Sequence, residues 1–304
     1  MCNVLLGTAV GDALGVPFES MLINNPDLMK WDGKTFGASR YHQLKAGQYS
    51  DDTQMSIMVA ESLIENKGFN PADLSARYVD WIVSGAARGY GKTTLSAVQN
   101  LQAGKSWTES GVVGSYGNGT AMRAAPFGVF YRNDLTSLIE VVKVDSAITH
   151  ISEDAEAGAL AIAIAAYYAC NRDTDNLLDK ISVHLPDSKV KKTVSSLDSL
   201  LNSHDITPAQ ALRVLGTRAD VRQTVPSALY CFIKFGSYHE AIVTAIRAGG
   251  DTDTTAAIVG ALFGARLGMQ GIDDDFYSVE DFDKLLILDN QLYNKSANDF
   301  FPRI

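Results

Sequence analysis

Two short segments combine aspartates with hydroxyl residues in a way that could bind hard metal ions. The first is Ser50-Asp51-Asp52-Thr53, and the second is Asp251-Thr252-Asp253-Thr254, nearly two hundred residues later. Carboxylate and hydroxyl oxygens are the ligands that Mg²⁺ and Mn²⁺ prefer, and a pair of such ions needs several carboxylates to offset its charge. Four aspartates would be sufficient, so the two segments together predict a metal site.

Each segment also has an ordinary structural explanation. Residues 249–250 are both glycine and can end one helix, while Asp253 or Thr254 stands where the N-cap of the next helix would lie. Acids at 51–52 would likewise stabilise the start of a helix through its macrodipole. Asp251 lies two residues before Asp253, so the two carboxylates could meet at one point only if the segment is extended or a turn. The alternative is two capped helix junctions with surplus charge.

Glycine at every fourth position marks two helices that must be closely approached. A helix over 4–15 carries Gly7, Gly11 and Gly15, and a helix over 255–268 carries an equivalent row, Gly260, Gly264 and Gly268. Glycine destabilises a helix by roughly 1 kcal/mol relative to alanine, so a row on one face indicates that another backbone approaches there. We expect these to be tightly packed central helices.

Helical periodicity continues through nearly the whole chain, and no convincing strand alternation is present. Residues 71–103 predict two helices joined by a flexible loop at 85–91, and residues 171–224 predict peripheral helices. An apolar helix is expected from Pro226 to Phe235, before the second acidic segment. The predicted fold class is therefore all-α, with one compact orthogonal helical domain over 1–304.

A glycine-rich stretch at 111–126 surrounds Ser115, Tyr116 and Asn118 and leads into a short helical run. Backbone of this kind can offer free N–H groups to an anion, and the nearby hydroxyl and amide add donors. The stretch is not a P-loop, because no Gly-Lys-Ser/Thr follows, and a tight turn is the alternative.

Two further residues have no role that their own surroundings assign. Glu19 lies in a loop just past the first helix, where a solvated glutamate is common. His150 precedes an apolar helix, where packing or capping is the usual role of a histidine.

Composition limits the class of protein. The chain has 304 residues, is 46% hydrophobic and carries a formal net charge of −9, so it can bury a large core and offers no basic stripe for nucleic acid. Cys2, Cys170 and Cys231 are odd in number and widely spaced, without the spacing of a zinc site or a disulfide framework. No signal peptide or apolar run of bilayer length is evident. We therefore expect a soluble protein in a reducing, cytoplasmic compartment, with no membrane contact.

Five motifs occur in a fixed order. They are Gly-Asp-Ala-Leu-Gly-Val-Pro-Phe-Glu (11–19), Ser-Asp-Asp-Thr (50–53), Gly-Ser-Tyr-Gly-Asn-Gly-Thr-Ala-Met-Arg (114–123), Thr149-His150 and Gly-Gly-Asp-Thr-Asp-Thr (249–254). Together they resemble the ADP-ribosylglycohydrolase family, which includes the dinitrogenase-reductase activating glycohydrolases. The resemblance extends from residue 4 to about residue 268. It implies an all-α fold with a dinuclear Mg²⁺ or Mn²⁺ centre at the base of a cleft that holds ADP-ribose.

The resemblance also assigns residues. The implied ligands of the two metal ions are Ser50, Asp51, Asp52, Asp251, Asp253 and Thr254. The implied substrate-binding residues, with the diphosphate at the glycine-rich loop and adenine near Tyr116, are Gly114, Ser115, Tyr116, Gly117, Asn118, Gly119, Met122, Arg123 and His150. Glu19 is the implied acid, base or substrate gate, with Asp251 as its rival. Ser50 stands where the family commonly has threonine, which keeps the hydroxyl but loses a methyl that restricts its rotamer.

The expected reaction is hydrolysis of the glycosidic bond between ADP-ribose and an acceptor, by a monomer that acts on an ADP-ribosylated protein or a small-molecule conjugate. The glycine-rich loop looks more like the branch that acts on serine-linked or O-linked ADP-ribose than the arginine branch. Two other functions are compatible with the sequence. A metal-dependent phosphohydrolase would release phosphate or AMP, and a non-catalytic, ADP-ribose-binding or lens-crystallin-like relative would be expected to have lost some of the four aspartates, which are all present.

Overall fold

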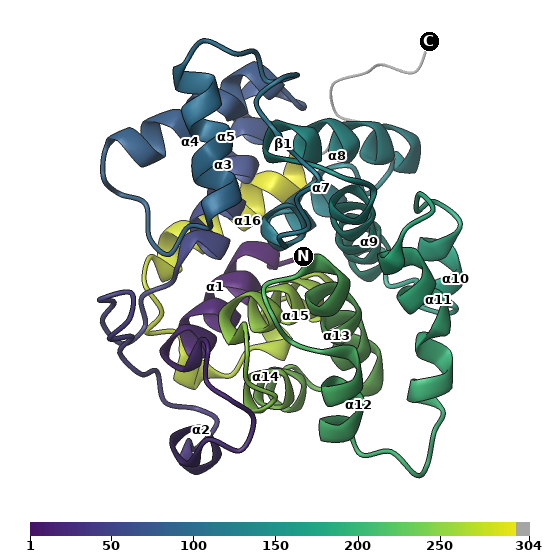
Figure 1. Ribbon diagram of the computed structural model, residues 1–304. Helices are drawn as coiled ribbons and strands as arrows, with labels where there is room; N and C mark the ends of the chain where they lie inside the picture. Colours follow the sequence, from purple (N-terminus) through teal and green to yellow (C-terminus); the bar gives the residue numbers. More distant parts are fainter. Residues whose placement is uncertain (296–304) are drawn as a thin grey trace.

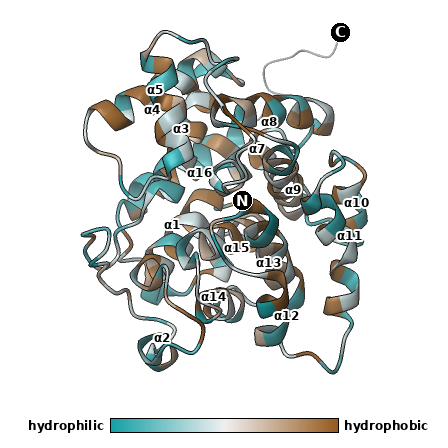
Figure 2. Ribbon diagram, viewed as in Figure 1, coloured by the Kyte–Doolittle hydropathy of each residue, from teal (hydrophilic) through white to brown (hydrophobic). Residues whose placement is uncertain are grey.

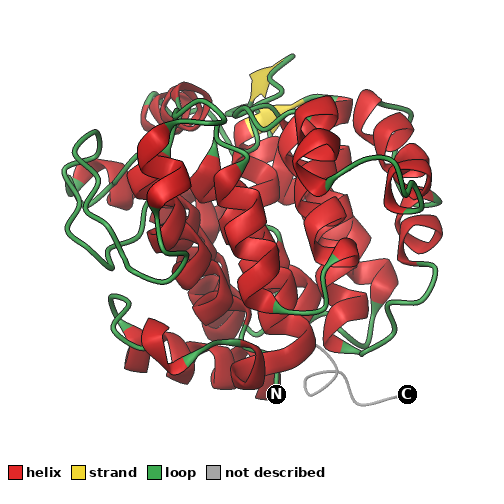
Figure 3. Ribbon diagram, turned by 90° about the horizontal axis from the view of Figure 1, so that it is seen from below, coloured by secondary structure: helices red, strands yellow, loops and turns green. Residues whose placement is uncertain are grey.

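The computed structural model describes residues 1–295, and its regular secondary structure is almost entirely α-helix, joined by loops (Figures 1 and 3). The predicted all-α class is confirmed. The only strands within residues 1–295 are β1 (Val112–Val113) and β2 (His150–Ile151), which pair in parallel with Val112 opposite His150. In that part of the chain, no helix combines the length and the apolar character needed to cross a bilayer. Residues 296–304 of the expected domain lie outside the described residues.

Most of the segments in which the sequence predicts a helix are helical in the structure. In chain order they are α1 (Val4–Gly15), η1 (Val16–Phe18), α2 (Pro26–Lys30), α3 (Asp51–Asn66), α4 (Pro71–Val83), α5 (Lys92–Gln102), α6 (Gly119–Met122), α7 (Ala125–Phe130), α8 (Leu135–Thr149), α9 (Glu153–Cys170), α10 (Leu177–Ser182), α11 (Lys189–Leu201), α12 (Pro208–Leu215), α13 (Val221–Lys234), α14 (Tyr238–Arg247), α15 (Thr252–Leu267), η2 (Gly268–Gly271), η3 (Asp274–Phe276) and α16 (Phe282–Asn294).

Helices α1 and α15 form the centre of the fold, and their glycine rows face each other. A Cβ atom on Gly7 would lie less than 3.0 Å from the carbonyl oxygen of Gly260, and a Cβ atom on Gly260 would lie equally close to the Gly7 carbonyl. Real Cβ atoms essentially never come so near to another backbone. The predicted close packing of these two helices is therefore confirmed, because the glycines of each helix leave room for the backbone of the other.

The two helices run antiparallel, which brings the end of α1 to the start of α15. Gly7 lies against Gly260, whereas Gly15 lies against Thr252 and Asp253. The Thr252 hydroxyl donates a hydrogen bond of 2.8 Å to the Gly15 carbonyl and fixes this end of the contact. Glu19 follows immediately after η1, so the chain delivers it beside the second acidic segment.

Asp12 of α1 fastens the start of α3 to the same place. This fully buried carboxylate accepts hydrogen bonds from the Ser50 N–H at 3.0 Å, the Thr53 N–H at 3.1 Å and the Thr53 hydroxyl at 2.7 Å. A carboxylate at a helix N-terminus satisfies donors that have no partner within the helix. The sequence alone does not indicate a role for Asp12. In the structure it holds the first acidic segment beside α15.

The remaining helices surround this centre. Helix α9 is buried along most of its length, as its apolar sequence predicts, and α10 and α11, which carry many hydrophilic residues, lie beside it (Figure 2). One expectation is corrected, because α13 begins at Val221 and contains Pro226 instead of starting there. The Asp220 side chain caps this earlier start by accepting a hydrogen bond from the Arg222 N–H.

The cysteines also depart from expectation. Cys2 and Cys170 form a disulfide that joins the residues before α1 to the last residue of α9, and Cys231 is free and buried. These two cysteines are separated by 168 residues, so their pairing depends on tertiary structure and has no signature in local spacing. The cysteine pattern therefore no longer supports the expectation of a reducing compartment.

The contact between α1 and α15 predicts a large difference between two glycine substitutions. Gly7→Ala should lower the free energy of unfolding by about 1–3 kcal/mol, because the added methyl group must displace the backbone of α15. Gly236→Ala is the control, because a Cβ at Gly236 has no heavy atom within 4 Å. Chemical denaturation measures both variants, and a Gly7→Ala protein as stable as the control would contradict the described packing.

Candidate metal centre and active site

The two acidic segments meet in one cavity. Its volume is about 330 Å³, and Asp51 and Asp52 from the start of α3 line it together with Asp251, Asp253 and Thr254 from the start of α15. The Thr254 hydroxyl donates to Asp52 Oδ2 at 3.3 Å, so the two segments are in direct contact. Each segment thus begins a helix, as the structural explanation requires, and also contributes to a shared cluster, as the metal interpretation requires.

The buried carboxylates in this cluster have hydrogen-bond donors but no basic partner among the described residues. Burial raises the pKa of Asp51 and Asp52 well above the usual value, and the neighbouring Asp12 carboxylate adds to the effect in both. Burial does the same for Asp253, with Asp251 as the main neighbouring charge. Within residues 1–295, no lysine or arginine forms an ion pair with any of these four cavity-lining aspartates. Buried charge of this density requires a cation or protonation.

One oxygen atom indicates where a cation would be accommodated. Asp52 Oδ1 is buried and has no hydrogen-bond partner among the described residues, while Oδ2 of the same side chain accepts from the Ser50 hydroxyl at 3.2 Å. An unsatisfied buried acceptor is unfavourable unless a ligand completes it. Carboxylate and hydroxyl oxygens suit a hard divalent ion, so the donor set fits Mg²⁺ or Mn²⁺. The six ligand positions implied by the family resemblance lie together here, with Ser50 bonded to Asp52 although it does not line the cavity surface.

The glycine-rich loop reaches the same cavity with only part of its length. Gly117, Asn118, Gly119 and Met122 line it. The Asn118 side-chain amide donates to the Asp251 carboxylate and, at 3.0 Å, to the Thr224 hydroxyl. Asn118 therefore orients a carboxylate of the metal cluster, in addition to any contact that it makes with a substrate.

The first half of the loop lies outside the cavity lining. The Ser115 hydroxyl bonds to Thr93 at 3.0 Å. Tyr116 is 52% exposed, and the Arg222 guanidinium stacks on its ring 4.0 Å from the ring centre. Gly114 precedes them at a positive φ of 74°. These residues are placed to meet a ligand only where it extends beyond the acidic cluster.

His150 lies beneath the loop as an uncharged side chain. Burial, and then the positive charge of Arg123, lower the pKa of His150 to about 3. Its Nδ1 is 2.8 Å from the Thr149 hydroxyl oxygen, and that oxygen accepts a hydrogen bond from Arg123 at 3.0 Å. If the Thr149 proton points to Nδ1, then Nε2 carries the imidazole proton next to Gly117.

The expectation that Arg123 contacts a substrate is corrected. Its side chain is fully buried and does not line the cavity. The guanidinium forms an ion pair with Asp145 at 3.1 Å and donates to the Gly119 carbonyl at 3.0 Å. The position of Arg123 within the motif suggested a ligand contact, but the side chain instead holds α6 to α8.

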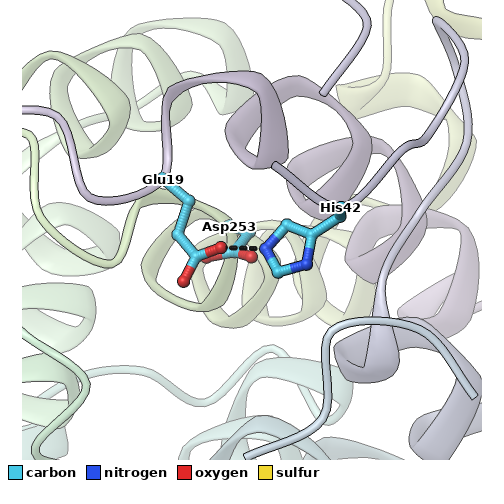
Figure 4. Close-up of side chains that lie close together, drawn as sticks. All are labelled: Glu19, His42 and Asp253. Atoms are coloured by element: carbon cyan, nitrogen blue, oxygen red, sulfur yellow. Dashed lines mark hydrogen bonds and ion pairs between the residues drawn. The ribbon is translucent and has the colours of Figure 1, made fainter. Parts of the chain in front are cut away.

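Glu19 stands over the acidic cluster and is paired with a histidine that the sequence did not single out (Figure 4). The Glu19 carboxylate hydrogen-bonds to His42 Nε2, and one ligand atom from each of Glu19, His42 and Asp253 lies within 4.8 Å of the others. His42 comes from the polar loop that precedes the first acidic segment. No motif surrounds it, so only the folded structure reveals its place.

Comparison with known proteins shows which family the chain resembles. The family model described as ADP-ribosylglycohydrolase matches residues 1–300. An uncharacterised protein of Archaeoglobus fulgidus is 34% identical over 272 residues, which cover 87% of this chain and 86% of that protein. The ADP-ribosylhydrolase ARH3 of Mus musculus is 24% identical over 335 residues, covering 95% of this chain and 90% of that protein.

A solved structure shares the fold. It is described as an ADP-ribosylglycohydrolase-related protein complex, and it matches with a TM-score of 0.79 at 24% identity, covering 97% of this chain and 96% of the matched chain. The resemblance carried by the five motifs is confirmed by the family match along nearly the whole sequence. The chain belongs to the ADP-ribosylglycohydrolase family.

Proposed function

We propose that this protein is a metal-dependent hydrolase that cleaves the glycosidic bond between ADP-ribose and an acceptor and releases ADP-ribose. The observation that carries the proposal is the meeting of the two acidic segments in one cavity with the glycine-rich loop and Glu19 at its edge. Membership of the ADP-ribosylglycohydrolase family supports ADP-ribose as the group that is bound.

The residues that would hold a pair of Mg²⁺ or Mn²⁺ ions are the six named from the sequence. They are Ser50, Asp51, Asp52, Asp251, Asp253 and Thr254. Bound divalent ions at such a site bind substrate oxygens and lower the pKa of water. The buried carboxylates of the chain would also favour positive charge that develops on the ribose as its glycosidic bond breaks.

The walls of the cavity would bind the rest of the substrate. The backbone of Gly117 and Gly119 and the uncharged His150 can donate hydrogen bonds to diphosphate oxygens without adding positive charge next to the carboxylates. Tyr116, which is exposed and stacked on Arg222, offers an aromatic face to adenine. These contacts would fix the distal ribose at the acidic end of the cavity.

Glu19 is the better placed of the two candidate acid–base residues. Its carboxylate lies at the cavity edge with 23% of the side chain exposed, whereas Asp251 is 7% exposed and is committed to Asn118. In the proposed reaction, water forms the new bond to the anomeric carbon as the bond to the acceptor breaks. Glu19 accepts a proton from that water and then releases it, and the departing acceptor takes up one proton, so the reaction consumes one water molecule and yields ADP-ribose and the free acceptor.

The acidic cluster predicts how pH and metal ions affect stability. In chelator, the free energy of unfolding should fall as the pH rises from about 5 to about 8. The cluster carboxylates have higher pKa values when folded than when unfolded, so the stability present while they are protonated is lost as they ionise. Asp253→Asn should therefore be more stable than wild type in chelator near pH 8, and this difference in stability should be smaller near pH 5.

Metal ions should reverse that order. Adding Mg²⁺ or Mn²⁺ at 100 times the dissociation constant should stabilise wild type by about 2.7 kcal/mol, with a smaller gain for Asp253→Asn. The exposed Asp205 supplies the control, because Asp205→Asn should follow wild type in both conditions. Chemical denaturation measures all three proteins. If chelator and metal leave the ranking unchanged, the cluster does not bind these ions.

The reaction itself predicts specific products. Wild-type protein with Mg²⁺ or Mn²⁺ should release intact ADP-ribose from at least one of a panel of serine-linked, arginine-linked and acetyl-ester conjugates, measured by mass spectrometry. Chelator or Asp251→Asn should abolish release, while Asp205→Asn retains it. Release of AMP or phosphate would instead identify a phosphohydrolase. Binding of ADP-ribose by wild type without turnover of any conjugate would identify a non-catalytic relative.

A further inference from the structure

The loop before α3 places one side chain directly on the proposed catalytic carboxylate. His42 Nε2 forms a hydrogen bond with Glu19, and the two side chains point toward each other close to Asp253 (Figure 4). The His42 side chain is only 10% exposed, although it belongs to a polar loop, and the neighbouring Tyr41 is 79% exposed. The loop therefore turns this histidine, and not its neighbour, into the site.

The turn that carries His42 is constrained by its own contacts. Ser39 and Leu44 form an antiparallel bridge, with backbone hydrogen bonds of 3.0 and 2.9 Å, and both residues are buried. The Ser39 hydroxyl accepts a hydrogen bond from the His42 N–H at 3.3 Å. Gln43 adopts a positive φ of 57°, which reverses the chain at the tip. These contacts fix the backbone of the turn from which the imidazole projects.

A second loop encloses the imidazole on another side. Gly89, with a positive φ of 72°, lies so close that a Cβ there would be 3.4 Å from the His42 ring and 3.2 Å from Asp51 Oδ1. Arg88, the preceding residue, anchors this loop through a bidentate ion pair with Glu280 and a hydrogen bond of 3.1 Å to the Tyr49 carbonyl. His42 thus lies between an anchored loop and Glu19.

Electrostatics explain why Glu19 requires such a partner. The Glu19 charge is among the causes that raise the pKa values of Asp51, Asp251 and Asp253, which means that it is repelled by each of them. Glu19 also follows a short 3-10 helix, and a glutamate side chain has several rotatable bonds whose ordering costs entropy. A hydrogen bond from His42 Nε2 offsets part of this repulsion and restricts the rotamers of Glu19.

We propose that His42 is a positioning residue that holds the Glu19 carboxylate at the edge of the metal centre through the hydrogen bond from Nε2. The inference rests on the proposed function, because it assigns to His42 the control of the residue that accepts the proton in that reaction. The imidazole acts as a hydrogen-bond donor and undergoes no covalent or proton-transfer step of its own.

A double-mutant cycle separates this role from a structural one. His42→Ala should lower kcat by tenfold to about a hundredfold with a smaller change in KM, because a misplaced catalytic group mainly affects the transition state. His42→Gln, which retains an N–H donor, should recover part of that loss. In the Glu19→Gln background, His42→Ala should change kcat by less than about twofold, because the residue through which His42 acts is already lost.

Imidazole NMR tests the hydrogen bond without reference to turnover. The chain has five histidines, so ¹⁵N-histidine labelling and the His42→Gln variant assign the His42 signals. The Nε2 proton should be protected from exchange in wild type and should lose that protection in Glu19→Ala. The NMR signal does not depend on the reaction. If wild-type protein hydrolyses no conjugate, the proposed function is refuted, and the NMR experiment still tests the hydrogen bond between His42 and Glu19.

Three outcomes would overturn the inference. The first is an unprotected Nε2 proton in wild type. The second is a full loss of kcat on His42→Ala in both the wild-type and Glu19→Gln backgrounds, which would mean that His42 acts independently of Glu19. The third is loss of the Nε2 proton on addition of Mg²⁺, with less bound metal in His42→Gln, which would make His42 a metal ligand.

Discussion

The backbone contact between α1 and α15 is the constraint on which the rest of the molecule depends. Side chains larger than hydrogen would separate the two helices, and the ends that now coincide would move apart. Because the helices are antiparallel, the contact sets Glu19, which follows α1 and η1, beside Asp253 at the start of α15. Asp12 then extends the arrangement to α3 through three donors at that helix's first turn. Three helix ends converge on one cavity, and each brings its acids with it.

This convergence is unfavourable for folding unless a cation is present. Asp51, Asp52 and Asp253 are buried and repel one another, and no basic side chain among residues 1–295 neutralises them. By contrast, the buried Arg123 and Asp145 pair directly and leave no net charge in the core. The Arg123–Asp145 charges are thus paired, whereas the cluster carboxylates have no basic partner among residues 1–295. Buried like charges that destabilise the fold locally are expected at sites where a bound ligand neutralises them.

Sequence reasoning succeeded where local composition carries the signal. The glycine rows predicted close helix packing, and oxygen-rich segments around Asp52 and Asp253 predicted a shared cluster. It did not find residues whose roles arise only from tertiary contacts. Asp12 resembles a stray charge in an apolar helix until α3 is placed on it, and His42 is one polar residue in an ordinary loop. Arg123 lies within a motif but faces the core, and the pairing of Cys2 with Cys170 spans 168 residues. Local sequence contains no information on such long-range partners.

The central claim is that the two acidic segments jointly form a divalent metal centre that holds ADP-ribose. Anomalous diffraction from crystals grown with Mn²⁺ and ADP-ribose tests it most directly. The account predicts two manganese peaks in the cavity, each with ligands from both the segment at 50–53 and the segment at 251–254, and the distal ribose in contact with them. Manganese found only elsewhere, for example at the acidic run 273–275, with this cavity free of anomalous signal, would contradict the account.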